Sequence, residues 1–181
     1  MPNLPLPEGL ERMDLECVML SVAPLDIHAA YGKDLNEDDL FYGDTPDLKY
    51  AQGAVAENKA HITLLFGIHP SPRYRKSVDT VLGKWEPETL HVSGVSTFPI
   101  RDEDQEYYVV KGDVKVTRNL EEGRARIETL DYSDQFPEYH PHLTLAYVKR
   151  TADIDTWVKR LDEVFGGQDF EVTGLDYGDN D

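Results

Sequence analysis

Two short segments of the chain carry a histidine and a threonine in the same order. The sequence HITLLF at residues 61–66 recurs as HLTLAY at residues 142–147, with three positions identical. Side chains two positions apart on a β-strand lie on the same face. Each segment therefore presents one imidazole and one hydroxyl together, while the aliphatic residues between them point into a core. The four side chains are His61, Thr63, His142 and Thr144.

Two imidazoles and two hydroxyls that meet in one cleft suit the hydrolysis of a phosphodiester. A neutral imidazole takes the proton of the attacking water, and a protonated one delivers a proton to the leaving oxygen. The histidine pKa of about 6.5 populates both forms near neutral pH. His61 and His142 are predicted to be this acid and base, in an order that the sequence does not assign. Thr63 and Thr144 are predicted to bind the phosphoryl oxygens. This chemistry requires no metal ion and no cofactor.

The two motifs resemble those of the 2H phosphoesterase superfamily. This group includes LigT-type 2′-5′ RNA ligases, cyclic nucleotide phosphodiesterases and phage anti-CBASS enzymes. Its pattern is two His-x-[Ser/Thr]-apolar motifs, each on a central strand of one of two similar lobes, and residues 61–64 and 142–145 match it. The resemblance implies a metal-independent phosphodiesterase that acts on cyclic nucleotides or short, including cyclic, oligonucleotides. A phage enzyme that degrades host cyclic nucleotide signals is one form of it.

Other functions are compatible with the same residues. A module that kept the cleft without hydrolysis would act as a sponge for nucleotide signals, and a protein that used its acidic face would bind another protein. His140 and His142 form a His-x-His pair, a common beginning of a zinc or iron site. The positions after this pair, where carboxylate ligands would be expected, hold Thr144, Leu145 and Ala146.

The composition limits the class of protein and its partners. A chain of 181 residues with 40% apolar residues has room for one ordinary domain. One cysteine excludes an internal disulfide framework and a cysteine-rich zinc module. The net charge of −17 argues against binding long nucleic acid over the whole surface, so the predicted partner is a nucleotide or short oligonucleotide. The segments 58–78 and 139–152, which contain the motifs, have no Asp or Glu and are predicted to face an anion.

The ends and the hydropathy of the chain predict its location and domain organisation. No apolar run reaches the roughly 18–20 residues of a membrane helix, and the N-terminus lacks the features of a secretory signal. These observations predict a cytoplasmic protein, in the host cytoplasm if it is viral, with no membrane partner. The expected organisation is an N-terminal extension at residues 1–13 and a single 2H phosphoesterase-like domain at residues 14–181.

The elements that must position the motifs are a mixture of strands and helices. Strands are expected at residues 15–22, 61–68, 90–98, 107–116, 143–148 and 170–175. One helix is expected after Ser71, with Pro72 at its first position, and another after Asp153, ending at the glycines 166–167. Residues 118–132 are ambiguous, because Leu120, Ile127 and Leu130 allow a helix that Gly123 weakens. Residues 24–60 indicate a helix fragment and a long loop or lid. Together with the resemblance, this mixture predicts an α+β fold of two pseudo-symmetric lobes, each with a small antiparallel sheet and flanking helices.

Three residues outside the motifs are further candidates for binding the substrate. Tyr108 lies on a predicted strand and could stack on a base. Arg75 lies at the beginning of the helix that follows the first motif and could bind a phosphate. Glu171, on the closing strand, could accept a hydrogen bond from a base edge.

Overall fold

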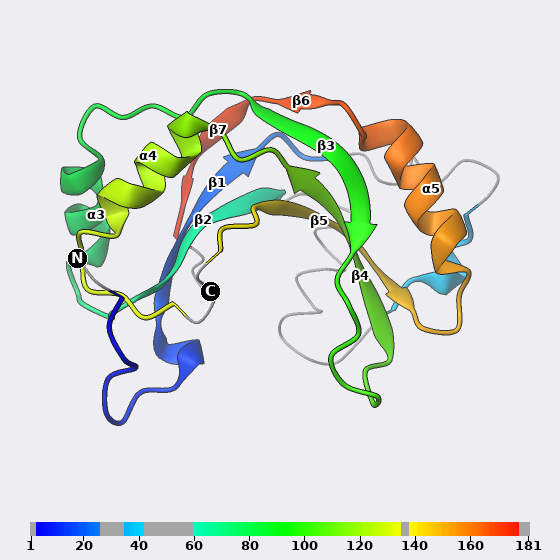
Figure 1. The fold of residues 1–181 in the computed structure, drawn as a ribbon, viewed down its shortest axis with the longest axis horizontal. Helices are drawn as coiled ribbons and strands as arrows, with labels where there is room; N and C mark the ends of the chain where they lie inside the picture. The colour runs from blue at the N-terminus through cyan, green and yellow to red at the C-terminus, as the bar shows by residue number, and fades with distance from the viewer. Residues whose placement is uncertain (1–2, 26–34, 42–59, 135–137, 178–181) are drawn as a thin grey trace.

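Two small antiparallel sheets form the frame of the molecule. The computed structural model describes residues 3–25, 35–41, 60–134 and 138–177. In one sheet the order of strands is β2 (His61–Ile68), β1 (Glu16–Val22) and β7 (Val172–Asp176). In the other it is β5 (His142–Lys149), β4 (Tyr107–Val114), β3 (Leu90–Thr97) and β6 (Asp169–Phe170). The two sheets curve into an arch, with the contacting strands β2 and β5 at its crown (Figure 1). The predicted α+β fold of two lobes is confirmed.

Helices cover the outer side of both legs of the arch (Figure 1). On one leg, α3 (Tyr74–Leu82) packs against α4 (Arg118–Ile127), which contacts β2; on the other, α5 (Ile154–Phe165) contacts β3 and β4. The short 3-10 helices η1 (Arg12–Asp14) and η2 (Glu37–Asp39) complete the described elements. As expected, Asp153 caps α5, since its carboxylate accepts a hydrogen bond from the Thr156 amide at 3.3 Å. Within the described residues, no helix has the length and apolar character needed to span a membrane.

Two of the expected elements differ from those observed. α3 begins at Tyr74 rather than Pro72, because Ser71 Oγ accepts a hydrogen bond from the Arg73 amide at 3.3 Å and stabilises the turn before the helix. The single closing strand expected at 170–175 is two strands, β6 and β7, which pair with β3 and β1. The chain crosses from one sheet to the other between them, at Glu171. Most of the loop or lid expected at 24–60 lies outside the described residues.

The strands β2 and β5 repeat each other in burial as well as in sequence. In both strands the first, third and sixth residues are half-buried, whereas the second, fourth, fifth and seventh are buried. The buried positions include Leu64, Leu65, Leu145 and Ala146, each at most 1% exposed. Each motif therefore directs its histidine and threonine away from the core, and the aromatic residue that ends each segment is half-buried like them.

The repetition extends to an irregularity in the backbone. Two successive residues of β1 pair with Thr63 and Leu65 of β2, so that β2 has one extra residue between them. In the same way, two successive residues of β4 pair with Thr144 and Ala146 of β5. An extra residue of this kind is a β-bulge, which bends the strand and increases its twist. Both motif strands thus bend directly after the threonine.

Each motif strand also pairs with one residue of the segment that precedes the other motif strand. Leu40, in the segment before β2, bridges Val148 of β5, and Tyr132, in the segment before β5, bridges Ile68 of β2. The segment that contains Tyr132 passes so close to β2 that only glycine fits at position 67. Gly67 has a φ of +111°, and a Cβ there would lie 2.2 Å from the Ser133 carbonyl oxygen. The two lobes therefore hold each other's motif strand in place.

Candidate active site

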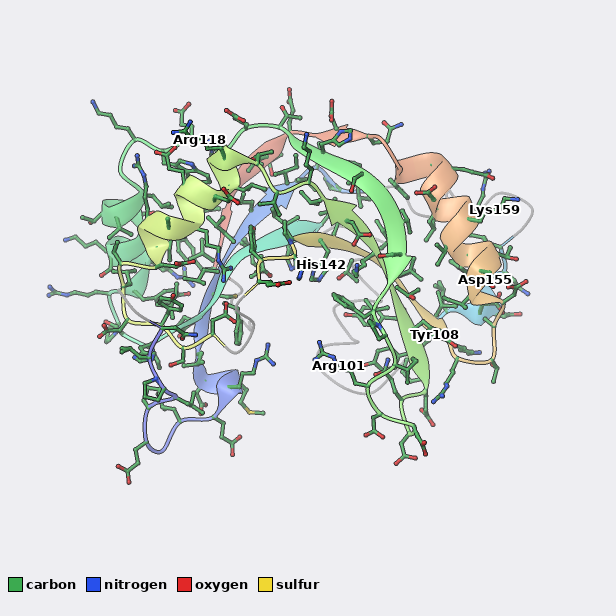
Figure 2. All side chains as sticks on the ribbon, in the orientation of Figure 1. Arg101, Tyr108, Arg118, His142, Asp155 and Lys159 are labelled. Atoms are coloured by element: carbon green, nitrogen blue, oxygen red, sulfur yellow. The ribbon has the colours of Figure 1, made fainter. Side chains whose placement is uncertain are left out.

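A pocket of about 460 Å³ lies on the concave side of the arch. Its lining includes Thr63 and Phe66 of β2 and His142 of β5, together with residues of the loops of both lobes. Figure 2 shows His142 beneath the crown of the arch. The volume is in the range of sites for small organic ligands. Both motif strands thus contribute to the cavity, through Thr63 and His142, whereas His61 and Thr144 are not among its lining residues.

The two motif histidines lie within electrostatic range of each other. His61 begins β2 and His142 begins β5, and the charge of His61 is one of the groups that lower the pKa of His142. Burial of the imidazole is the largest cause of this lowering, and Lys111 adds to it, whereas the His140 carbonyl and Asp113 act in the opposite direction. His142 therefore favours its neutral form near pH 7, the form that a general base requires.

The ring of His142 is held by two contacts. Its Nδ1 donates a hydrogen bond to the His140 carbonyl oxygen at 3.1 Å, and the ring of Phe98 packs against it edge to face with centroids 4.8 Å apart. A hydrogen bond from Nδ1 to a carbonyl fixes the tautomer, so the lone pair resides on Nε2. The second motif thus presents one basic nitrogen in a fixed orientation.

A network of polar side chains on β3 and β4 lies beside the second motif. Lys111 is directly opposite Thr144 and Asp113 directly opposite His142 in the β4–β5 register. The ammonium of Lys111 donates to Ser96 Oγ at 2.8 Å and pairs with the carboxylate of Asp113, to which Ser96 donates at 2.7 Å. These residues were not predicted from the sequence. The feature of the sequence that could have identified them is a pair of charged residues, Lys111 and Asp113, at alternate positions of an otherwise apolar strand.

Two side chains from the connection between β4 and β5 form hydrogen bonds with the backbone of the first motif strand. Tyr139 Oη donates a hydrogen bond to the Thr63 carbonyl at 2.8 Å, and Arg124 Nη1 donates to the Leu64 carbonyl at 3.1 Å. These carbonyls lie at the bulge of β2. Arg124 also donates to Asp134 at 2.7 Å, and its guanidinium carbon lies 4.6 Å from the centre of the Tyr139 ring. The backbone that orients the Thr63 hydroxyl is therefore anchored by two side chains that the sequence analysis missed.

A scan against protein-family models matches residues 45–179 to the 2′-5′ RNA ligase superfamily. The chain belongs to this superfamily. Its members are phosphoesterases and ligases, so the resemblance inferred from the two motifs is confirmed. The match includes both motif strands of the superfamily fold and leaves out β1 and the residues before it. No curated protein matches the chain.

The structure also gives the surroundings of the other site residues predicted from the sequence. Thr144 is half-buried next to Lys111, on the side of the sheet that carries His142. Tyr108 is half-buried opposite the buried Val148, Arg75 lies on α3 with its guanidinium 5.1 Å from the Tyr177 ring, and Glu171 is exposed. None of these four residues lines the pocket. Their roles in substrate binding remain predictions.

The His140–His142 pair does not acquire a third ligand from the described part of the chain. Nε2 of His140 interacts with the Glu138 carboxylate at 3.1 Å, and the His140 side chain is 78% exposed. Nδ1 of His142 is occupied by the His140 carbonyl. In residues 3–25, 35–41, 60–134 and 138–177, no group of three His, Cys, Asp or Glu side chains is arranged to hold a metal ion.

Proposed function

We propose that the protein is a phosphodiesterase that hydrolyses cyclic nucleotides or short oligonucleotides by general acid–base catalysis from His61 and His142, without a metal ion. The observation that supports this most strongly is the repetition of sequence, burial and bulge in β2 and β5, which contribute Thr63 and His142 to one pocket. A pair of half-sites with one imidazole and one hydroxyl each matches a reaction that needs one proton removed and one supplied.

The environment of His142 supports its assignment as the base. Its neutral form is favoured, so Nε2 accepts the proton of the water whose oxygen attacks phosphorus. His61, protonated, then gives its proton to the leaving oxygen as the P–O bond breaks. The hydroxyls of Thr63 and Thr144 donate hydrogen bonds to the non-bridging oxygens, where negative charge accumulates in the transition state. The products are a phosphomonoester and a free hydroxyl.

A panel of substrates tests this proposal. The protein is incubated with 2′,3′-cyclic and 3′,5′-cyclic mononucleotides and with 2′-5′ and 3′-5′ linked oligonucleotides, each with and without excess EDTA, and the products are separated by chromatography. We expect a phosphomonoester product from at least one substrate, at a rate that EDTA does not change. Loss of turnover in EDTA and its recovery with zinc would favour a metal site on His140 and His142. Stoichiometric binding without product would favour a nucleotide sponge.

The pH dependence provides a second prediction. Since His142 must be neutral and its pKa lies below the ordinary value of 6.5, kcat/KM should follow a bell-shaped curve whose acidic limb has its midpoint below 6.5. The charged and titratable groups that act on His142 are Lys111, Asp113 and His61. Lys111→Met removes a cation that disfavours the imidazolium and leaves the Asp113 carboxylate without this counterion. Both effects raise the pKa, so the acidic limb should move to higher pH.

The matched control for this prediction is Lys159→Met, on the outer face of α5 (Figure 2). This variant removes the same charge far from the pocket, and its profile should superimpose on that of the unmodified protein. An acidic limb that does not move in Lys111→Met, measured under the same ionic strength, would contradict the assignment of His142 as the base.

A further inference from the structure

The N-terminal segment, residues 3–5, pairs with the segment that precedes β5. The Leu4 amide donates a hydrogen bond to the Tyr132 carbonyl at 2.9 Å. The side-chain amide of Asn3 binds both polar groups of the Asp134 backbone, because it accepts from the amide at 2.8 Å and donates to the carbonyl at 2.5 Å. Figure 1 shows this N-terminal segment near the free end of the leg that contains β1 and β2. It lies outside the part of the chain that matches the superfamily.

A buried serine adds a further hydrogen bond to this pairing. Ser133 is 8% exposed, and its hydroxyl donates to the Pro5 carbonyl at 3.0 Å. The single proton of the hydroxyl is used in this bond, so Nε2 of His69 is the donor in its 2.8 Å contact with the same oxygen. A buried polar group that loses a partner is unfavourable, and the N-terminal segment is therefore fixed against Ser133.

The segment that receives these hydrogen bonds is paired with β2 on its other side. The Ser133 amide donates to the Gly67 carbonyl at 2.8 Å, and the His69 amide donates to the Asp131 carbonyl at 3.0 Å. Residues 131–134 therefore lie between β2 and the N-terminal segment. Their position depends on hydrogen bonds made in both directions.

Asp134 connects this pairing with the backbone of the first motif. Its carboxylate accepts a hydrogen bond from Arg124 at 2.7 Å, and Arg124 also donates to the Leu64 carbonyl at the bulge of β2. Asp134, Arg124 and Thr63 all line the pocket. The backbone of Asp134 is thus held by Asn3, while its side chain holds the arginine that anchors the bulge.

We propose that Asn3 is a positioning residue for the reaction. By fixing the backbone of Asp134, it keeps Arg124 on the bulge of β2, and the backbone at the bulge orients the Thr63 hydroxyl. This inference rests on the proposed function. The residues predicted from the sequence to be an N-terminal extension then support the active site of this chain. Because the Thr63 hydroxyl acts on charge that develops in the transition state, the contribution of Asn3 is to kcat rather than to KM.

The variant Asn3→Ala tests this role. It removes both hydrogen bonds to the Asp134 backbone and keeps those of Leu4 and Pro5, so the protein should remain folded. We expect kcat on the best substrate of the panel to fall by about threefold or more, with KM nearly unchanged, because a small displacement of a group that acts in the transition state slows the reaction. Steady-state kinetics measures both constants, and denaturant unfolding measures the stability of each variant.

The matched control is Asn119→Ala. The Asn119 side chain makes the same pair of contacts with backbone, because it accepts from the Glu88 amide at 2.9 Å and donates to the Glu86 carbonyl at 2.9 Å. It lies near the beginning of α4 and does not line the pocket. This variant loses two hydrogen bonds of the same kind and should keep the kcat of the unmodified protein.

A combination of variants tests whether Asn3 acts through Arg124. Asn3→Ala is added to Arg124→Ala, or to Arg124→Lys if the alanine variant is too unstable to assay, since lysine lacks the guanidinium that spans Asp134 and the Leu64 carbonyl. Two residues that act in one chain of contacts have effects that do not add. The second substitution should therefore lower kcat little further than the Arg124 variant alone.

Three results would overturn this inference while the proposed function stands. They are an unchanged kcat in Asn3→Ala, an equal fall of kcat in Asn119→Ala, and a full further fall of kcat when Asn3→Ala is added to the Arg124 variant. An unmodified protein that cleaves no diester of the panel would overturn the proposed function itself.

Discussion

Replacement of His142 by alanine is expected to lower kcat for phosphodiester hydrolysis by about 10²–10⁴-fold, the usual contribution of a general acid or base. The same result is expected for His61→Ala. The two residues supply complementary proton transfers in one step, so the double variant should lose little more than either single variant. Purified variants are compared by initial rates on the best substrate of the panel and by thermal unfolding.

The fold should survive these substitutions. His142 is half-buried at the pocket, and its described contacts are the hydrogen bond to the His140 carbonyl and the contact with the Phe98 ring. A cavity that opens to solvent at the pocket costs little, because water can fill it. The loss of rate should therefore occur without a comparable loss of stability.

His91→Ala is the matched control for the two histidine variants. His91 is also a strand histidine, but it lies opposite Asp169, interacts with that carboxylate at 2.7 Å and does not line the pocket. It should keep the full rate. Full activity in His61→Ala or His142→Ala would show that the histidine concerned transfers no proton in the reaction, whatever its position.

The side chains of each motif strand that point away from the core were predictable, because this orientation depends on local alternation along the strand alone. The sequence placed His61 with Thr63 and His142 with Thr144 on an exposed face, and the burial of β2 and β5 agrees. The bulge also had a local signal that the sequence analysis did not use. In HITLLF and HLTLAY the alternation of aliphatic and other residues is broken by two successive aliphatic residues, Leu64–Leu65 and Leu145–Ala146, which is where the extra residue is inserted.

The residues that support the motifs were not predictable because they depend on contacts between segments far apart in the sequence. Gly123 made residues 118–132 ambiguous as a helix, whereas the structure shows that the glycine is required by packing. A Cβ at this position would lie 2.4 Å from the Trp85 ring. Arg124, one residue later, donates a hydrogen bond to the Leu64 carbonyl of β2. No periodicity within the helix could reveal a hydrogen bond to a strand sixty residues away in the sequence.

Arg124→Ala is the second variant with a large expected effect, on stability and rate together. The Arg124 and Asp134 side chains are 13% and 12% exposed, and their ion pair joins α4 to the segment before β5. Removal of one partner of a buried pair leaves a carboxylate that has lost its counterion, so the free energy of unfolding should fall by about 3 kcal/mol. Denaturant unfolding measures this change, and Arg118→Ala should remain within about 0.5 kcal/mol of the unmodified protein.

The effect on the rate follows from the carbonyls that Arg124 and Tyr139 hold. Both hydrogen bonds fix the backbone at the bulge of β2, and that backbone orients the Thr63 hydroxyl. Because the hydroxyl stabilises charge that develops only in the transition state, its displacement should lower kcat more than it raises KM. Arg124 thus acts as a positioning residue rather than a catalytic one.

Tyr139→Phe separates the rate from the stability. It keeps the ring beside Arg124 and removes only the hydrogen bond to the Thr63 carbonyl, at a cost of about 1 kcal/mol in the free energy of unfolding. If the bulge positions the first motif, kcat on the best substrate of the panel should fall several-fold in this well-folded variant, with KM nearly unchanged. A variant with the rate of the unmodified protein would mean that β2 is held rigidly enough by its pairing with β1, and that the anchoring of the bulge serves stability alone.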